Sequence, residues 1–395
     1  MSRGTTTWLL YAVFACMAFL LNGLGAVLAP LQKELGVNRG DVAFYPGLFA
    51  AGLVIVGVSG GPLVQRIGRP TALRVALGML GLGAVLFAVP GRGPTLLGDL
   101  LIGLGGALLI QLVPALLSAL HPGMAAAAVG EVNGLASAVS VLAPLSVAAA
   151  IGSGAGWRVG YLAPALIVLA LLAWPLSRAS LPVAPRPVAG RRSEAAPVLG
   201  RWVDLVLAVS VEFCMVFWAA SALGDWHGAS AAQAPALASL FLVGMAACRA
   251  LAAPITRRLP DGQLLITLCA LVAAVGFALF WVGPNLAAAA VGLAVTGLGV
   301  ALLYPTTISR LIAAWPQAPD QASARAALGS GLAIGGAPFA LGRLSDAVGL
   351  RAAYLLVPVL LGLLVARGAL GAPRLRPVEA LGELDDAQPE PPRAE

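Results

Sequence analysis

Apolar residues along this chain gather into long stretches, which are separated by short segments rich in charge, proline or glycine. Each stretch has about the 20 residues that an α-helix needs to cross the hydrocarbon core of a bilayer. The pattern therefore predicts an all-α membrane protein with twelve transmembrane helices. The stretches lie near 8–31, 42–64, 71–90, 95–119, 124–152, 158–177, 203–224, 233–256, 263–283, 285–314, 323–342 and 352–370.

Composition excludes most soluble classes of protein. Of the 395 residues, 59% are hydrophobic and 10% are charged, whereas a soluble domain carries about 25% charged residues. Twelve spans of about 20–25 residues would use most of the chain and leave only short loops. No phosphate-binding loop or cluster of nucleophile, base and metal ligands occurs, so we expect neither an enzyme nor an ATP-driven pump.

The formal net charge of +7 suggests a lipid partner rather than nucleic acid. The basic residues form short clusters between apolar runs, and most of them fall on the side that carries the N-terminus. By the positive-inside rule, both termini are then cytoplasmic in a multi-pass protein of the inner membrane. The four cysteines lie in apolar runs and there are only two histidines, so no metal or cofactor site is expected.

An internal repeat divides the chain into two halves. Gly103-Leu-Gly-Gly-Ala-Leu-Leu109 recurs as Gly297-Leu-Gly-Val-Ala-Leu-Leu303, and two shorter matches recur at nearly the same offset: Pro62 and Arg66 with Pro254 and Arg258, and Gly156, Arg158 and Tyr161 with Gly349, Arg351 and Tyr354. Six spans per half is an even number, so the halves are parallel repeats about an axis along the membrane normal. The expected divisions are a six-helix bundle over 1–178, a cytoplasmic linker over 179–201, a second bundle over 202–372 and a disordered acidic, proline-rich tail over 373–395.

With two pseudo-symmetric six-helix bundles, the chain resembles the major facilitator superfamily (MFS). Gly61-Pro-Leu-Val-Gln-Arg66-Ile-Gly68-Arg69 follows the second span and is similar to the family's loop motif G-x-L-x-D-R-x-G-R, with Gln65 where the family usually has Asp. The resemblance implies a secondary transporter in which two bundles expose one path alternately to each side. It also implies a gating role for loop charges, namely Arg66, Arg69, Arg257 and Arg258, with Glu131 at the start of the fifth span; membrane orientation alone could equally explain the arginines.

Two ionisable residues inside predicted spans are candidates for proton coupling. Glu212 lies well inside the seventh span and Arg249 lies at a similar depth in the eighth. Ionisable groups are costly in the bilayer core, so both side chains should face the interior of the bundle. Burial favours the neutral form of a carboxyl group, which suits a proton carrier. A purely structural ion pair between Glu212 and Arg249 is the alternative.

Polar and aromatic residues deep in other spans are candidates for solute contacts. The family lines its cavity with spans 1, 4, 7 and 10, which implies that Asn22, Gln111, Trp218 and Tyr304 face the solute; Asn133 in the fifth span joins them. The amide of Asn133 could instead bond a neighbouring helix, and Trp218 could instead serve packing.

These features predict a secondary active transporter that moves a small organic solute by alternating access. We expect coupling to protons, a monomer, and export rather than uptake, because the predicted cavity is largely apolar. A passive facilitator, an uptake symporter and a membrane receptor without transport activity use the same fold and stay open as alternatives.

Overall fold

A computed structural model describes residues 4–371 apart from 123, 179–195 and 315–318, and this part of the chain is helical throughout, with short connections. The first half contains α1 (Thr5–Leu35), α2 (Arg39–Val42), α3 (Phe44–Ile67), α4 (Arg69–Ala88), α5 (Arg92–Leu120), α6 (Ala125–Gly152) and α7 (Trp157–Ser177). The second half contains α8 (Ala196–His227), α9 (Gln233–Ala250), α10 (Ala252–Arg258), α11 (Gly262–Val282), α12 (Leu286–Val300), α13 (Leu303–Ala313), α14 (Pro319–Val348), α15 (Leu350–Ala353) and α16 (Leu356–Gly371).

In the described part of the chain, sixteen helices form twelve spans because four spans consist of two pieces. In each of these spans a proline follows the break within four residues: Pro46 in α3, Pro254 in α10, Pro305 in α13 and Pro358 in α16. Proline lacks the N–H that would bond the carbonyl four residues earlier, and its ring crowds that carbonyl. A proline alone does not break a span, however, since α5, α6 and α14 continue through Pro114, Pro144 and Pro338.

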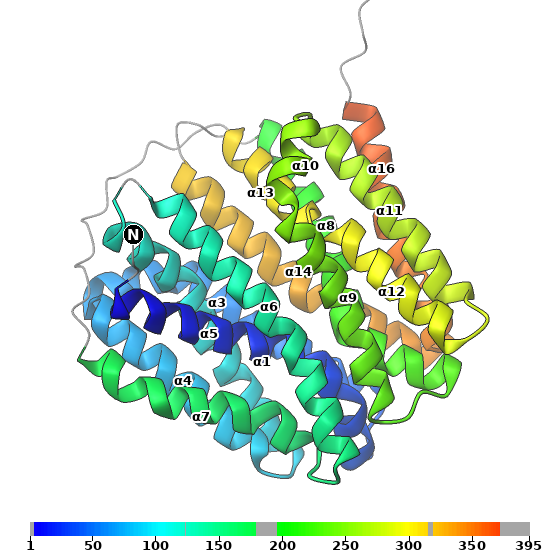
Figure 1. Cartoon of the computed structure of the whole chain (residues 1–395), viewed down its shortest axis with the longest axis horizontal. Coiled ribbons are helices and arrows are strands. Elements are labelled where there is room, and N and C mark those ends of the chain that lie inside the picture. The colour runs from blue at the N-terminus through cyan, green and yellow to red at the C-terminus, as the bar shows by residue number, and fades with distance from the viewer. Residues whose placement is uncertain (1–3, 123, 179–195, 315–318, 372–395) are drawn as a thin grey trace, which may run out of the picture.

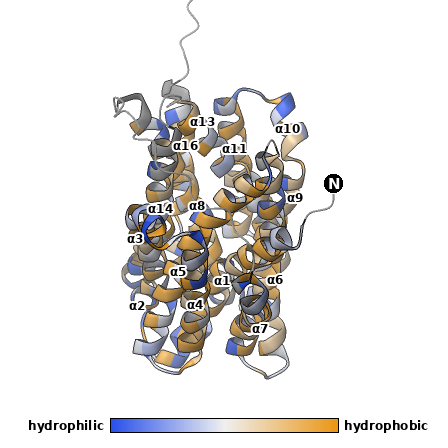
Figure 2. Cartoon of the chain, turned by 90° about the vertical axis from the view of Figure 1, so that its left-hand side faces the viewer, coloured by the Kyte–Doolittle hydropathy of each residue, from blue (hydrophilic) through white to orange (hydrophobic). Residues whose placement is uncertain are grey.

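The spans have the apolar surface that a bilayer requires. Within the described residues, eleven helical stretches are long and apolar enough to cross a membrane. The remaining long helix, α14, supplies the twelfth span and is less apolar because it carries Arg325, Arg343 and Asp346. Figure 2 shows apolar residues along most of each helix, with hydrophilic residues gathered near the helix ends. The twelve-helix prediction is confirmed.

Matching contacts in the two halves show that the sequence repeat is also a structural repeat. Tyr161 donates to the Leu20 carbonyl at 2.8 Å, and Tyr354 donates to the Cys214 carbonyl at 3.2 Å. Gly156 and Gly349, which precede α7 and α15, share the left-handed φ values of 83° and 80°, a conformation that favours glycine.

The predicted linker and tail mostly lie outside the described residues. The linker was expected over 179–201, yet α8 already begins at Ala196, so its last six residues are helical. The tail expected over 373–395 lies entirely in the part of the chain that is not described.

The two halves meet where α14 packs on α2 and α3, where α6 packs on α9, and where α1 packs on α8. In Figure 1 the first half occupies the lower left and the second half the upper right. We call the side on which α1 begins and α16 ends the terminal side, and the other the opposite side. Close glycine contacts join the halves towards the opposite side: Gly25 of α1 packs on the Val216 backbone of α8, and Gly335 of α14 packs on Ala50 and Gly47 of α3.

Candidate functional site

Glu212 and Arg249 lie together between helices of the second half, as their spacing predicts. Glu212 comes from the middle of α8 with 12% of its side chain exposed, and Arg249 from the end of α9 with 32% exposed. Arg249 Nη2 lies 3.5 Å from Glu212 Oε1, at the outer limit of a hydrogen bond. Arg249 is the one polar partner that Glu212 has among the described residues, and so the carboxyl group is held loosely.

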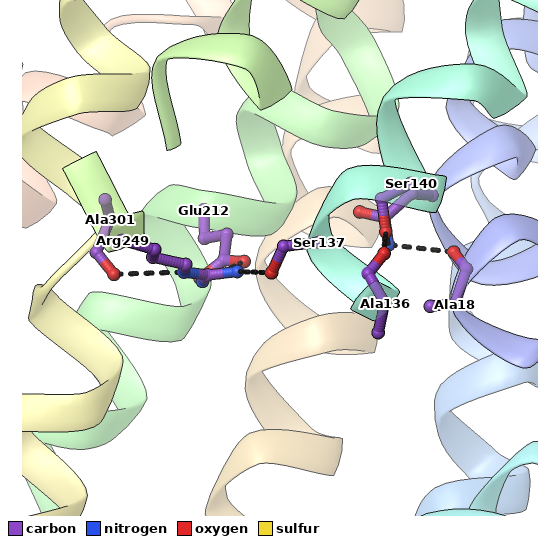
Figure 3. A network of polar contacts seen from close by, with 8 residues as sticks. Ala18, Ala136, Ser137, Ser140, Glu212, Arg249 and Ala301 are labelled. Carbon is purple, nitrogen blue, oxygen red and sulfur yellow. Dashed lines mark hydrogen bonds and ion pairs between the residues drawn. The ribbon is translucent and has the colours of Figure 1, made fainter. Parts of the chain in front are cut away.

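The guanidinium group of Arg249 has two further partners, which Figure 3 shows beside Glu212. Its Nε donates to the Ala301 carbonyl at 3.2 Å and its Nη1 donates to Ser137 Oγ at 3.2 Å. The Ala301 carbonyl is available because Pro305, four residues later, has no N–H to donate to it. Arg249 therefore stays hydrogen-bonded even when it is separated from Glu212.

The bond from Arg249 to Ser137 crosses between the two halves. Ser137 belongs to α6 of the first half, while Arg249 and Glu212 belong to the second. Tyr304, at the start of α13, is close enough to interact electrostatically with both charged residues. A movement of α6 relative to α9 would break the bond to Ser137 and leave Arg249 with its partners in the second half, Glu212 and the Ala301 carbonyl.

Asn22 lies near this cluster on α1 of the first half. Its Nδ2 donates to the Ala18 carbonyl at 2.9 Å and to Ser140 Oγ of α6 at 3.0 Å. Asn22 also lines a small space of ≈ 10 Å³ between the halves, whose other walls are apolar and include Met215 and Phe241. The helices are thus nearly in contact beside Asn22 in this arrangement.

Within the described residues, the three other predicted solute contacts form no hydrogen bond with this cluster. Gln111 is exposed on α5 and lies against Gly60 of α3, and Asn133 is exposed and donates to the Val129 carbonyl of its own helix at 2.8 Å. Trp218 is fully buried and donates to the Pro338 carbonyl at 3.0 Å. This placement favours the packing role for Trp218, because the indole joins α8 to α14 within the second half.

The predicted gating residues lie at the terminal side. Arg66, Arg257 and Arg258 are exposed and form no ion pair within the described residues, whereas Arg69 is buried at the start of α4. Glu131 is exposed and accepts from the Tyr11 hydroxyl of α1 at 2.8 Å.

Asp99 of α5 is a second acidic residue within the membrane, but its surroundings differ from those of Glu212. Its side chain is completely buried inside the first half, and no side chain pairs with it among the residues described. Asp99 is fully shielded from solvent, whereas 12% of the Glu212 side chain is exposed. Glu212 is therefore the better placed of the two carboxyl groups for proton exchange.

Sequence reasoning missed a polar contact that joins the halves on the opposite side. Arg39 of α2 forms an ion pair with Asp225 of α8. Asp346 of α14 accepts from the backbone N–H groups of Arg39 at 3.1 Å and Gly40 at 2.9 Å. Asp346 thereby satisfies free N–H groups at the start of α2. We call Arg39, Asp225 and Asp346 the opposite-side latch.

Opening of the opposite side should become easier when the latch is weakened. A partly exposed ion pair contributes about 0.2–1 kcal/mol, so Asp225→Ala should raise the fraction of open molecules up to about fivefold. Distances between spin labels at the exposed positions Val89 and Val282 would report the opening. The exchanged pair Arg39→Asp with Asp225→Arg should return the distances to those of the unmodified latch; failure to do so would show that the ion pair does not control opening.

Comparison with known proteins now identifies the family. The family model described as Major Facilitator Superfamily matches residues 8–226, more than half of the chain. The chain belongs to the major facilitator superfamily. Plastidic glucose transporter 4 of Arabidopsis thaliana is 29% identical over 203 residues, which are 49% of this MFS chain and 37% of that protein. The match thus spans little more than a third of the length of this curated relative.

Solved structures show the same MFS fold at low sequence identity. One is a bacterial homolog of the human lysosomal transporter Spinster in an inward-facing and occupied conformation; its TM-score is 0.76 at 15% identity, over 92% of this chain and 96% of that one. The inward-facing and unoccupied conformation gives 0.68 at 15% identity, over 94% and 97%. The family match and the shared fold identify a multi-pass membrane protein of the major facilitator superfamily.

Proposed function

We propose that this MFS protein is a secondary active transporter of a small organic solute, coupled to protons through Glu212. The observation that carries the proposal is the position of Arg249, which contacts Glu212 in its own half and Ser137 in the other half. A group that contacts both a carboxyl group and the domain interface can link protonation to the relative position of the halves. The proton site at Glu212 and the solute path between the halves would then both respond to the same movement of the halves, as coupling requires.

The coupling follows from the charges. With Glu212 ionised, Arg249 is attracted to it and is held in the second half. When Glu212 takes up a proton that attraction is lost, and Arg249 is held by the Ala301 carbonyl and Ser137 alone. Protonation would thereby favour the arrangement in which α6 and α9 are joined, and proton release would favour their separation.

The residues that line the space between the halves indicate the class of solute. Asn22, Met215 and Phe241 face the space between the halves, so an amphipathic organic molecule matches the path better than a multiply charged ion. The relative named as a glucose transporter supports an organic solute. The apolar walls favour export, in exchange for protons. Asn22 and Tyr304 are the proposed solute contacts nearest the coupling pair, and Gln111 and Asn133 would contact the solute nearer the terminal side.

The charge distribution supports an inner-membrane location with both termini in the cytoplasm. The exposed arginines Arg66, Arg257 and Arg258 then face the cytoplasm, where they and Arg69 and Glu131 would contribute to closing the terminal side. Both halves belong to one chain, so we propose that the monomer transports.

Proton movement in proteoliposomes tests the proposal directly. A thermal-shift screen of metabolites and drugs identifies a solute, because a ligand that binds the native state raises apparent stability. Adding that solute to one side should then change the internal pH reported by an enclosed dye, and an imposed proton gradient should drive accumulation. Accumulation that only reaches equal concentrations would instead establish a passive facilitator.

A further inference from the structure

A crevice on the opposite side of the protein lies outside the site described above. It has a volume of ≈ 660 Å³ and lies between the end of α1, the end of α8, the start of α9 and Trp157. Sites for small organic molecules have volumes of about 300–1,000 Å³. Small apolar residues form much of its wall, among them Ala29, Pro30 and Ala234. The crevice therefore has the size and the apolar walls of a small-molecule site.

Charged residues at this crevice leave one positive charge uncompensated. Glu34 is bonded to Arg158 at 2.5 and 2.6 Å, and Arg39 is paired with Asp225. Lys33 also lines the crevice, is exposed, and forms no ion pair within the described ranges. An anionic group is the natural partner for Lys33.

A buried hydroxyl group faces the same crevice without a partner. Ser221 of α8 lines the crevice, is 6% exposed, and its Oγ has no hydrogen bond among the described residues. Buried hydroxyl groups are nearly always hydrogen-bonded in native proteins, so an unpaired one indicates a missing partner. The crevice can supply that partner by holding a ligand with a polar group.

The positions of Lys33 and Ser221 set the length of such a ligand. Ala220 and Ala26 line both the crevice and the small space beside Asn22, so they form the inner end of the crevice. Lys33 lies seven residues beyond Ala26 on α1, about 10 Å along the helix axis. A ligand would present its anionic group to Lys33 near the outer end and a hydrogen-bonding group to Ser221 near the inner end.

We propose that this crevice binds a small organic monoanion, with a carboxylate on Lys33, a hydroxyl or amide on Ser221 and a short apolar body between them. The proposed binding site depends only on the crevice and on its contacts to Lys33 and Ser221. The crevice adjoins the space beside Asn22, so it could also bind the transported solute on its way across the membrane. This further role rests on the proposed transport function.

The unique lysine provides a direct test. Lys33 is the only lysine in the chain, so an amine-reactive ester, followed by mass spectrometry of its peptide, reports this position in the full-length protein. We expect saturating 6-hydroxyhexanoate to slow labelling of Lys33 at least fivefold, and the neutral 6-hydroxyhexanamide to leave it unchanged. Absence of protection by the carboxylate, or equal protection by both compounds, would overturn the proposal.

Variants of Ser221 and Lys33 test the two proposed ligand contacts separately. Ser221→Ala should raise the concentration of 6-hydroxyhexanoate needed for half protection about threefold to tenfold without changing the labelling rate of the free protein. Ser153→Ala, which alters an exposed serine on the same side, should leave protection unchanged. Calorimetry with Lys33→Gln, which removes an exposed charge, should show at least a tenfold weaker Kd; an unchanged Kd would exclude Lys33 as the partner.

Transport measured on the same preparation distinguishes the two proposals. Protection of Lys33 in a protein that moves no solute would retain the anion site and remove the transport function. Transport without protection would retain the function and remove the site.

Discussion

Replacing Glu212 by glutamine is expected to abolish proton-driven accumulation while leaving exchange of solute across the membrane. Glutamine has nearly the same shape as glutamic acid but cannot gain or lose a proton, so the attraction to Arg249 no longer changes during the cycle. A gradient of one pH unit supports about a tenfold solute gradient when one proton moves per solute. In Glu212→Gln proteoliposomes the accumulation ratio should fall to about one, measured beside counterflow of labelled solute.

A matched control makes that result specific. Asp261→Asn changes an exposed acid on the terminal side that caps α11 through bonds to the N–H groups of Gln263 and Leu264. Asparagine is an equally good N-cap, so this variant should accumulate solute normally. If Glu212→Gln still concentrates solute against its gradient, the coupling carboxyl group lies elsewhere. If counterflow is lost as well, Glu212 serves structure or solute binding rather than coupling.

Much of the architecture could be predicted because it depends on local patterns. Twenty-residue apolar stretches fix where the helices lie, and the repeat predicts that Gly156 and Gly349 occupy equivalent turns. Proline positions alone do not show where spans are interrupted, since a break precedes Pro305 whereas α5, α6 and α14 continue through their prolines. Glu212 and Arg249 could be placed together, since two residues at similar depth in antiparallel neighbours face one another when both avoid lipid.

Contacts between distant segments could not be predicted in the same way. Asp346 accepts from the N–H of Gly40, although some three hundred residues separate them and neither sequence position carries a periodic signal. Trp218 is an aromatic residue of a kind that often lines cavities. It is buried instead, because the position of α14 brings the Pro338 carbonyl to its indole. The crevice at Lys33 likewise depends on how the ends of three helices are placed, which no single helix specifies.

Enlarging Gly25 should nearly stop transport by holding the opposite side open. A β-carbon at Gly25 of α1 would overlap the backbone carbonyl of Val216 on α8, and both residues lie in the part of the interface that closes the opposite side. Overpacking of this kind costs about 1–3 kcal/mol. Since the halves separate here when the opposite side opens, the cost falls on the closed state alone. Gly25→Val should therefore shift the equilibrium towards the open state about 5–150-fold.

The two readouts for Gly25→Val are the initial rate of solute counterflow and the distance between spin labels at Val89 and Val282. We expect a loss of rate together with a longer distance, because a transporter held open to one side cannot complete its cycle. Gly81→Val is the control, since a β-carbon at Gly81 of α4 meets nothing within 4 Å. A Gly25→Val protein that transports normally would mean that α1 and α8 can separate without opening the opposite side. The close approach of these two helices would then be packing within a rigid body rather than a gate, and the closing contact would have to lie at α2 and α14.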